Sequence, residues 1–211
     1  MDWQALIETQ PALAPAPAAL RAVAKYREVK IGEILFRQGD RPKSVFYVIA
    51  GEVRLLRRAR NGAEIILQRS RNGFVAEASL DVEAYHCDAL ATTAGAVLCF
   101  PIQAFKAALD ADKTFHRLWG THLAREVRKL RAQCERLSLN TAAERIIHYI
   151  EAEGVGGAIT LNQSRKAWAA ELGLSHEAMY RTLRRLQAEG VLDIDRERIA
   201  MGRQRNVGPR R

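Results

Sequence analysis

A short segment near the C-terminal end carries side chains that can form hydrogen bonds with base edges. Glu177 can accept from the amino group of cytosine, and Arg181 can donate to both acceptors of guanine. His176, Tyr180 and Arg184 lie beside them at helical spacing. The apolar stripe of the same helix lies on another face and consists of Ala178, Met179, Thr182, Leu183 and Leu186. The polar face suits a DNA major groove, although a basic amphipathic helix alone is more often a solvated surface.

The surrounding residues predict the elements that would present this helix. Ser164 can cap a preceding helix, which has an apolar face of Trp168, Ala169 and Leu172. Gly173 can adopt the left-handed conformation of a sharp turn, and Ser175 can cap the second helix, which we expect to end near Glu189. A hairpin of residues 191–194 and 198–201 follows. Two helices, a tight turn and a hairpin form a winged helix-turn-helix.

Net positive charge is concentrated in the C-terminal half of the chain, which contains the predicted helix-turn-helix. The net charge is +9; residues 1–112 contain 14 basic and 13 acidic side chains, whereas residues 113–211 contain 19 and 11. Phosphate contacts supply much of the affinity for nucleic acids. The asymmetry therefore indicates a polyanionic partner, without distinguishing DNA from RNA.

The segment from Tyr26 to Ile102 has the pattern of an antiparallel barrel or roll. Its short β segments are EILFR, SVFYVIA, EVRLLRRA, EIILQRS, DALATTA and AVLCFPI. Turn signals occur at Gly32, Gly39-Asp40, Gly51, Asn61-Gly62 and Asn72-Gly73. The Ala-rich segment 11–20 is expected to lead into a short helix before the roll, and residues 203–211 to form a basic tail.

A long helix is predicted from about Asp112 to Leu139, because this stretch lacks proline and contains only Gly120 as a glycine. Its apolar positions are Phe115, Trp119, Leu123, Val127, Leu130, Cys134 and Leu137, and the second half follows a heptad pattern. The stripe can pack on the chain's own roll, on a second copy, or on each at different heights. We expect a parallel homodimer with a seam of Leu123, Val127, Leu130, Cys134 and Leu137. Two recognition helices related by a two-fold axis would read an inverted repeat.

Composition is ordinary for a soluble globular protein, with 48% hydrophobic and 27% charged residues. No apolar run approaches the roughly 20 residues of a membrane span. The N-terminus lacks the basic start and apolar core of a secretory signal, so a cytoplasmic location without membrane contact is expected. Cys87, Cys99 and Cys134 are far apart and form no CxxC motif, which predicts reduced thiols.

Four stretches together resemble the CRP/FNR family of bacterial transcription regulators. They are GEILFRQGD (32–40), FYVIAGEVRLL (46–56), NGFVAEASL (72–80) and LGLSHEAMYRTLRRLQAEGVL (172–192), and the resemblance extends over residues 20–200. It implies an α+β chain with a jelly-roll-like antiparallel β-roll that senses a signal. A dimer helix and a winged domain that binds double-stranded promoter DNA and contacts RNA polymerase would follow. The expected boundaries are 1–110, 111–139, 140–202 and 203–211.

The resemblance also assigns roles in DNA binding. Its base-reading positions correspond to His176, Glu177, Tyr180 and Arg181, and His176 replaces the arginine of the cyclic-AMP-binding members. The shorter imidazole at that position means that the half-site sequence cannot be copied from those members. Expected phosphate contacts are Ser164, Arg165, Lys166 and Arg184.

The sensor half departs from the cyclic-nucleotide-binding members. They use a Gly-Glu pair for the ribose and an Arg-Ser pair for the phosphate, where this chain has Ala76-Glu77 and Cys87-Asp88. Asp88 would repel a phosphate, so cyclic AMP is not expected to be the effector. The candidate pocket consists of Glu77, Ala78, Ser79, His86, Cys87, Asp88, Leu130 and Arg131. The small-molecule effector and any cofactor stay unidentified.

Three kinds of redox site can be considered for the cysteines of this sequence. An iron–sulfur cluster would need N-terminal cysteines, whereas the first cysteine is Cys87. The adjacent His86 and Cys87 can bind haem iron, form a reactive thiol, or simply complete the strand that enters the core. Cys134 can face its counterpart in a parallel dimer and form a disulfide, or pack as a small apolar residue.

Two further function classes compete with a regulator. Cupin-like rolls hold catalytic metals with several histidines and a glutamate, but His86 is the only histidine in the barrel segment. We find no catalytic triad or carboxylate pair, so neither an enzyme nor a metal site is expected. The other class is a ligand-binding protein whose basic domain contacts proteins; sequence-selective DNA affinity would distinguish it.

Overall fold

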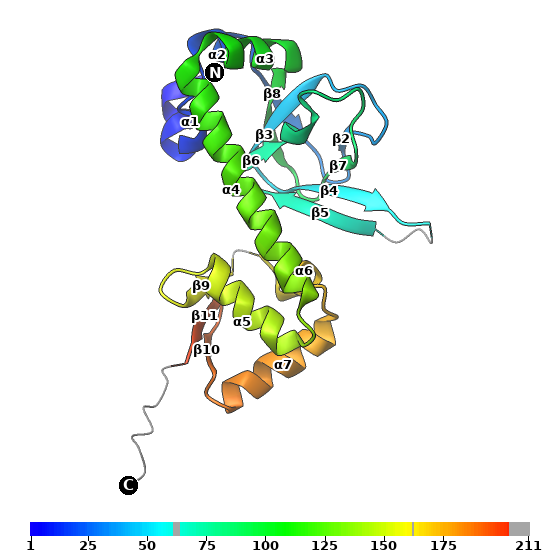
Figure 1. Ribbon diagram of the computed structural model, residues 1–211, viewed down its shortest axis with the longest axis vertical. Helices are drawn as coiled ribbons and strands as arrows, with labels where there is room; N and C mark the ends of the chain where they lie inside the picture. Colours follow the sequence, from blue (N-terminus) through cyan, green and yellow to red (C-terminus); the bar gives the residue numbers. More distant parts are fainter. Residues whose placement is uncertain (61–63, 162, 203–211) are drawn as a thin grey trace. The chain divides into compact units, whose positions relative to one another are not determined.

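The structure, a computed structural model, describes residues 1–60, 64–161 and 163–202 (Figure 1). The chain divides into two compact units, 1–123 and 124–211, with the boundary inside the helix α4 (Lys113–Ser138). The ends of α4 lie within one residue of the predicted ones. The expected Asn61-Gly62 turn and the basic tail lie outside the described residues.

Short helices begin the N-terminal unit. They are α1 (Trp3–Thr9), the 3-10 helix η1 (Pro11–Leu13) and α2 (Ala18–Val23). The side chain of Asp2 caps α1 by accepting from the backbone N–H of Gln4 at 2.9 Å. The predicted helix before the roll is α2, whereas α1 was not predicted.

Two antiparallel sheets of four strands each form the β-roll, which confirms the predicted architecture. One sheet has the order β1-β8-β3-β6 and the other β2-β7-β4-β5. The strands are β1 (Lys25–Val29), β2 (Ile34–Phe36), β3 (Ser44–Ala50), β4 (Val53–Arg58), β5 (Glu64–Ser70), β6 (Gly73–Val75), β7 (Asp88–Ala91) and β8 (Gly95–Pro101). Sequence reasoning did not predict β1, which is mostly exposed, or β6, which has only three residues.

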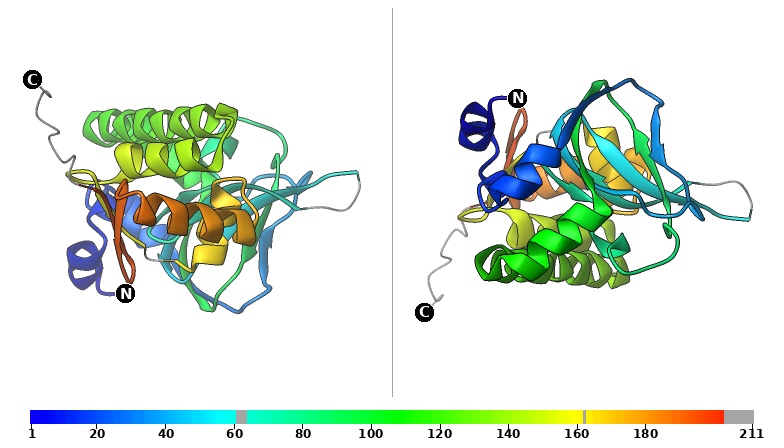
Figure 2. Two further views of the ribbon diagram at one scale, coloured as in Figure 1. Left: turned by 90° about the horizontal axis from the view of Figure 1, so that it is seen from below. Right: turned by 90° about the horizontal axis from the view of Figure 1, so that it is seen from above.

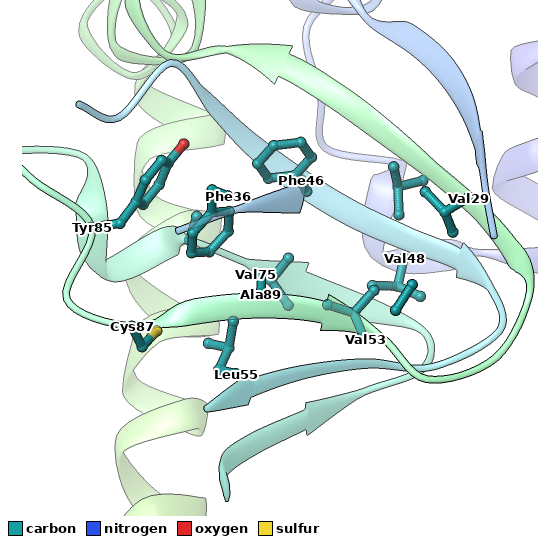
Figure 3. Close-up of a cluster of buried hydrophobic side chains, with 13 residues drawn as sticks. Val29, Phe36, Phe46, Val48, Val53, Leu55, Val75, Tyr85, Cys87 and Ala89 are labelled. Carbon is teal, nitrogen blue, oxygen red and sulfur yellow. The ribbon is translucent and has the colours of Figure 1, made fainter. Parts of the chain in front are cut away.

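Strand β3 is buried on both faces. Alternate side chains of a strand point to opposite sides, and each side of β3 is covered by a core. Phe46 and Val48 face the interior of the roll, whereas Val45 and Tyr47 face a second core outside it. Figure 3 shows the interior, where Phe36, Phe46 and Tyr85 lie at one end of a packed row of aliphatic side chains. The ring centroids of Phe36 and Tyr85 are only 3.9 Å apart.

The second core lies between the sheet that contains β3 and the helices α1, α2, α3 (Ile102–Ala111) and the first half of α4. The Trp119 ring meets Phe105 at 4.8 Å and Phe74 at 5.0 Å between centroids. Phe115 and Trp119 are only 4% and 6% exposed. The first half of the α4 stripe therefore packs on the chain's own roll.

The second half of the stripe is exposed. Val127, Leu130 and Leu137 are 45%, 49% and 43% exposed, and Cys134 is exposed as well. Leu123 lies at the transition, since it is partly buried and packs against the second core. The single stripe of the sequence thus divides into a packed half and a largely exposed half.

The C-terminal unit contains α5 (Ala142–Glu153), α6 (Arg165–Glu171) and α7 (His176–Ala188). Its sheet has the order β10-β11-β9, with β9 (Ala158–Thr160), β10 (Leu192–Asp195) and β11 (Arg198–Met201). Figure 2 shows α6 and α7 beside each other and the β10–β11 hairpin next to α7. The predicted helix-turn-helix and hairpin are confirmed, whereas α5 and β9 were not predicted.

Candidate nucleic-acid interface

Side-chain caps define the two helices of the helix-turn-helix as predicted. The Ser164 hydroxyl accepts from the backbone N–H of Ala167 at 3.2 Å, which starts α6. The Ser175 hydroxyl accepts from the backbone N–H of Ala178 at 3.1 Å, which starts α7. Each cap satisfies a donor that the first helical turn cannot pair internally.

The turn between α6 and α7 requires glycine. Gly173 has φ +64°, and an added Cβ would lie 3.0 Å from Leu137 Cδ2 and 3.1 Å from Arg145 Nη1. Arg145, on α5, donates to the carbonyl oxygens of Leu172 and Gly173, both at 3.2 Å. Sequence reasoning missed Arg145 because it missed α5.

A signal for α5 was nevertheless present. Thr141 and Glu144 form a capping box, in which the Thr141 hydroxyl accepts from the Glu144 N–H and the Glu144 carboxylate accepts from the Thr141 N–H. Threonine followed three residues later by glutamate, ahead of an apolar run, is typical of a helix start. The pattern would have predicted the helix that supports the turn.

Helix α7 buries one face and exposes the other. Met179, Thr182, Leu183 and Leu186 are buried against α5, α6 and β10. His176, Glu177, Arg181 and Arg184 are exposed, and Tyr180 is partly buried. Within the described part of the chain, neither Glu177 nor Arg181 takes part in an ion pair. Their polar groups are therefore available to a partner.

Three of the predicted contact residues meet one another. The rings of His176 and Tyr180 lie 4.5 Å apart between centroids, and the Arg165 guanidinium carbon lies 5.6 Å from the centroid of the Tyr180 ring. Arg165 also donates from Nη2 to the backbone oxygen of Arg196, in the β10–β11 turn, at 2.9 Å. Lys166 is exposed on the same first turn of α6.

The predicted effector residues of the roll lie on a 3-10 helix and on the approach to β7. Glu77, Ala78 and Ser79 form η2 (Glu77–Ser79), which follows Ala76 in a left-handed conformation with φ +71°. Ser79 is buried, whereas Ala78 is exposed.

Asp88 and the backbone of His86 have hydrogen-bond partners within the roll. Asp88 accepts at Oδ1 from the backbone N–H of Gln38 at 2.7 Å. His86 is exposed, and its backbone oxygen accepts from Arg57 Nε at 2.7 Å. Leu130 and Arg131 are exposed residues of α4 and belong to the C-terminal unit. Among the described residues, no group of three or more His, Cys, Asp or Glu side chains is arranged to hold a metal ion.

Cys87 belongs to the roll interior, where Figure 3 shows its sulfur directed at Leu55 and Ala89. The side chain is 1% exposed. Burial raises the pKa of its thiol to about 11. The thiol is therefore protonated at neutral pH, which favours the core role of Cys87 over a reactive thiol.

Alkylation of the native protein at pH 8 is expected to spare Cys87, because Cys87 would have to lose its proton inside an apolar core. The reactivity of Cys87 should rise only as the pH approaches 11, where its thiolate forms. Peptide mass spectrometry after timed iodoacetamide treatment measures the site, with the urea-unfolded chain as the reference. Equal modification rates of Cys87 in the native and the unfolded chain at pH 8 would contradict the assignment.

The models of two domain families match this chain. The cyclic nucleotide-binding domain matches residues 26–112, and the Crp-like helix-turn-helix domain matches residues 143–201. The chain belongs to the CRP/FNR family. It is thus a DNA-binding transcription regulator of the CRP/FNR type, in agreement with the resemblance in its sequence.

Curated CRP/FNR relatives span most of the chain. The transcriptional activator protein FnrA of Stutzerimonas stutzeri is 28% identical over 186 residues, which cover 84% of this chain and 76% of FnrA. The CRP-like protein Clp of Xanthomonas oryzae pv. oryzae is 27% identical over 174 residues, which cover 75% of each chain.

Solved structures of CRP/FNR regulators share the fold. FixK2 from Bradyrhizobium japonicum has a TM-score of 0.66 at 22% identity, over 85% of this chain and 92% of FixK2. The c-di-GMP-responsive regulator CLP from Xanthomonas campestris has a TM-score of 0.63 at 20% identity, over 90% and 99% of the two chains. None of the helices among the described residues is long and apolar enough to cross a membrane.

Proposed function

We propose that this CRP/FNR regulator binds an inverted-repeat promoter site as a parallel homodimer, under control of a signal sensed by the β-roll. The observation that carries the proposal is the exposed face of α7, where Glu177 and Arg181 form no ion pair within the described part of the chain. Glutamate and arginine left unpaired on the second helix of a helix-turn-helix are suited to base edges in the major groove.

The roles of the individual side chains follow from their chemistry. Glu177 accepts from a cytosine amino group, and Arg181 donates to the neighbouring guanine or thymine. His176 and Tyr180 read the adjacent step together, because their rings are in contact. Lys166 and Arg184 contact phosphates, together with Ser164 at the N-terminus of α6. On the promoter, the bound dimer contacts RNA polymerase.

The second half of α4 supports the homodimer. Val127, Leu130 and Leu137 are large apolar side chains, each more than two-fifths exposed, at heptad spacing. A second copy of the same helix would cover them and place two α7 helices on successive major grooves about 34 Å apart. Cys134 would lie in this seam.

The proposed effector is a small molecule or a redox signal other than cyclic AMP. Cys87 and Asp88 occupy the positions at which cyclic-nucleotide-binding members place the phosphate-binding pair. The Cys87 side chain points into the core, and Asp88 is a carboxylate that would repel a phosphate.

In vitro selection from a library of randomised duplexes tests the proposed function. The full chain is expected to enrich an inverted repeat, called the selected duplex below, and to bind it more tightly than a scrambled duplex of the same composition. Cyclic AMP in the selection buffer is expected to leave the result unchanged. Recovery of no preferred sequence, with equal affinity for both duplexes, would contradict sequence-specific DNA binding.

Replacing Leu130 with aspartate is expected to convert the dimer to a monomer. Two facing carboxylates would be buried in an apolar seam, and a buried unpaired charge is strongly unfavourable. Sedimentation velocity of the full chain measures the change. Arg128→Asp, which places the same side chain on an exposed position of α4 outside the seam, is the matched control and should stay dimeric. A dimer in both variants would place the interface elsewhere.

A further inference from the structure

Arg165 joins three elements of the C-terminal unit, although the sequence suggested only a phosphate contact. It is the first residue of α6. Its guanidinium carbon lies 5.6 Å from the centroid of the Tyr180 ring on α7, which is a cation–π distance. Its Nη2 donates to the backbone oxygen of Arg196 at 2.9 Å, in the turn of the β10–β11 hairpin.

The turn that receives this hydrogen bond has an unusual backbone. Two residues, Arg196 and Glu197, connect β10 to β11, and Asp195 pairs with Arg198 at the end of the ladder. Arg196 has φ +50°, a left-handed conformation that is unfavourable for a residue with a Cβ. Such a turn needs support from its surroundings to hold one conformation.

The support comes from the segment that leads into α6 and from α6 itself. The backbone N–H of Leu161 donates to the Glu197 oxygen at 2.9 Å. Arg165 donates to the Arg196 oxygen, so each residue of the turn has its carbonyl bound. The Arg165 guanidinium is itself held over the Tyr180 ring, and Tyr180 is in contact with His176.

We infer that Arg165 is a positioning residue that fixes the β10–β11 turn relative to the base-reading face of α7. The chain of contacts runs from His176 through Tyr180 and Arg165 to the Arg196 backbone. It thereby fixes where the turn, with the exposed Arg196 side chain, lies when α7 enters the groove. This inference rests on the proposed DNA binding for its consequence, but the coupling itself is a property of the free protein.

Hydrogen exchange of the DNA-free full chain tests the coupling. Arg165→Ala is expected to accelerate amide exchange in residues 192–201 about tenfold, since a hydrogen bond and a cation–π contact are lost. Tyr180→Ala is expected to accelerate the same segment, because it releases the Arg165 guanidinium. Lys166→Ala, on the same helical turn, is the control and should change nothing there. Exchange within twofold of wild type in Arg165→Ala would overturn the inference.

Binding to the selected and scrambled duplexes then separates positioning from a simple phosphate contact. Arg165→Lys keeps the positive charge but loses the flat guanidinium that lies over the Tyr180 ring. We expect its preference for the selected duplex to fall about tenfold, the loss of a hydrogen-bonded contact of about 1.4 kcal/mol. Lys166→Ala should weaken both duplexes equally.

Failure of the Arg165 inference and failure of the proposed function would give different results. If Arg165→Lys binds both duplexes as wild type does, charge alone matters and the inference is overturned. If selection yields no preferred sequence, the proposed function fails, whereas the exchange experiment still decides whether Arg165 holds the turn.

Discussion

Alanine at Glu177 or at Arg181 is expected to reduce the preference for the selected duplex over the scrambled one by a factor of about 5 to 150. The factor corresponds to about 1–3 kcal/mol for the loss of one good contact to a base edge. Both side chains are exposed on α7 and contribute little to its packing. The change should therefore appear in DNA recognition and leave the fold intact.

The measurement is the ratio of dissociation constants for the two duplexes at fixed salt concentration, because salt alters phosphate contacts strongly. Arg185→Ala is the matched control. Arg185 is an exposed arginine on the same helix, but it pairs with Glu189 at 3.4 Å. Its loss should weaken both duplexes slightly and leave their ratio unchanged. A preference that survives in both Glu177→Ala and Arg181→Ala would assign base reading to other residues.

Trp168→Ala is expected to destabilise the C-terminal unit by about 3–5 kcal/mol, the usual cost of removing a buried tryptophan. Trp168 is 0% exposed, and its ring meets Tyr149 of α5 edge to face at 5.5 Å between centroids. It lies on α6 in the core shared by α5, α6 and α7. The substitution would leave a cavity beneath the helix-turn-helix.

A single unfolding curve would mix the two compact units, so local stability should be read from hydrogen exchange. Amides of α7 in the Trp168→Ala variant are expected to exchange at least about a hundredfold faster. Trp168→Phe should cost far less, because phenylalanine fills most of the space. It also removes an indole N–H that is buried without an acceptor among the described residues. Equal effects of the two substitutions would show that packing volume is not the cause.

Local signals in the sequence determined the helix-turn-helix closely. Ser164 and Ser175 are side chains that cap helices, and Gly173 is the residue type that tolerates a left-handed turn. These effects act within three or four residues, so residue type and spacing are sufficient to predict them. The α4 boundaries and the alternation of strands and turns in the roll were predictable for the same reason.

Elements with weak local signals were missed. Strand β9 has only three residues and becomes a strand because β11 supplies its hydrogen bonds. Strand β1 pairs with β8 while most of its side chains stay exposed, so it lacks the apolar pattern that identifies a strand. Pairing with a distant segment stabilises both, and spacing along the chain does not encode it.

Residue types and spacing were sufficient to identify candidate base-reading residues, the start and end of their helices, and the apolar stripe of α4. How that stripe is used became visible in the folded chain, where Trp119 lies in the chain's own core and Leu130 is exposed. The tertiary structure also decided that the Cys87 thiol is buried and that Arg165 spans α6, α7 and the β10–β11 turn. The physical reason is that burial and side-chain contacts depend on which distant segments meet, whereas caps and periodicity depend only on neighbours in the chain.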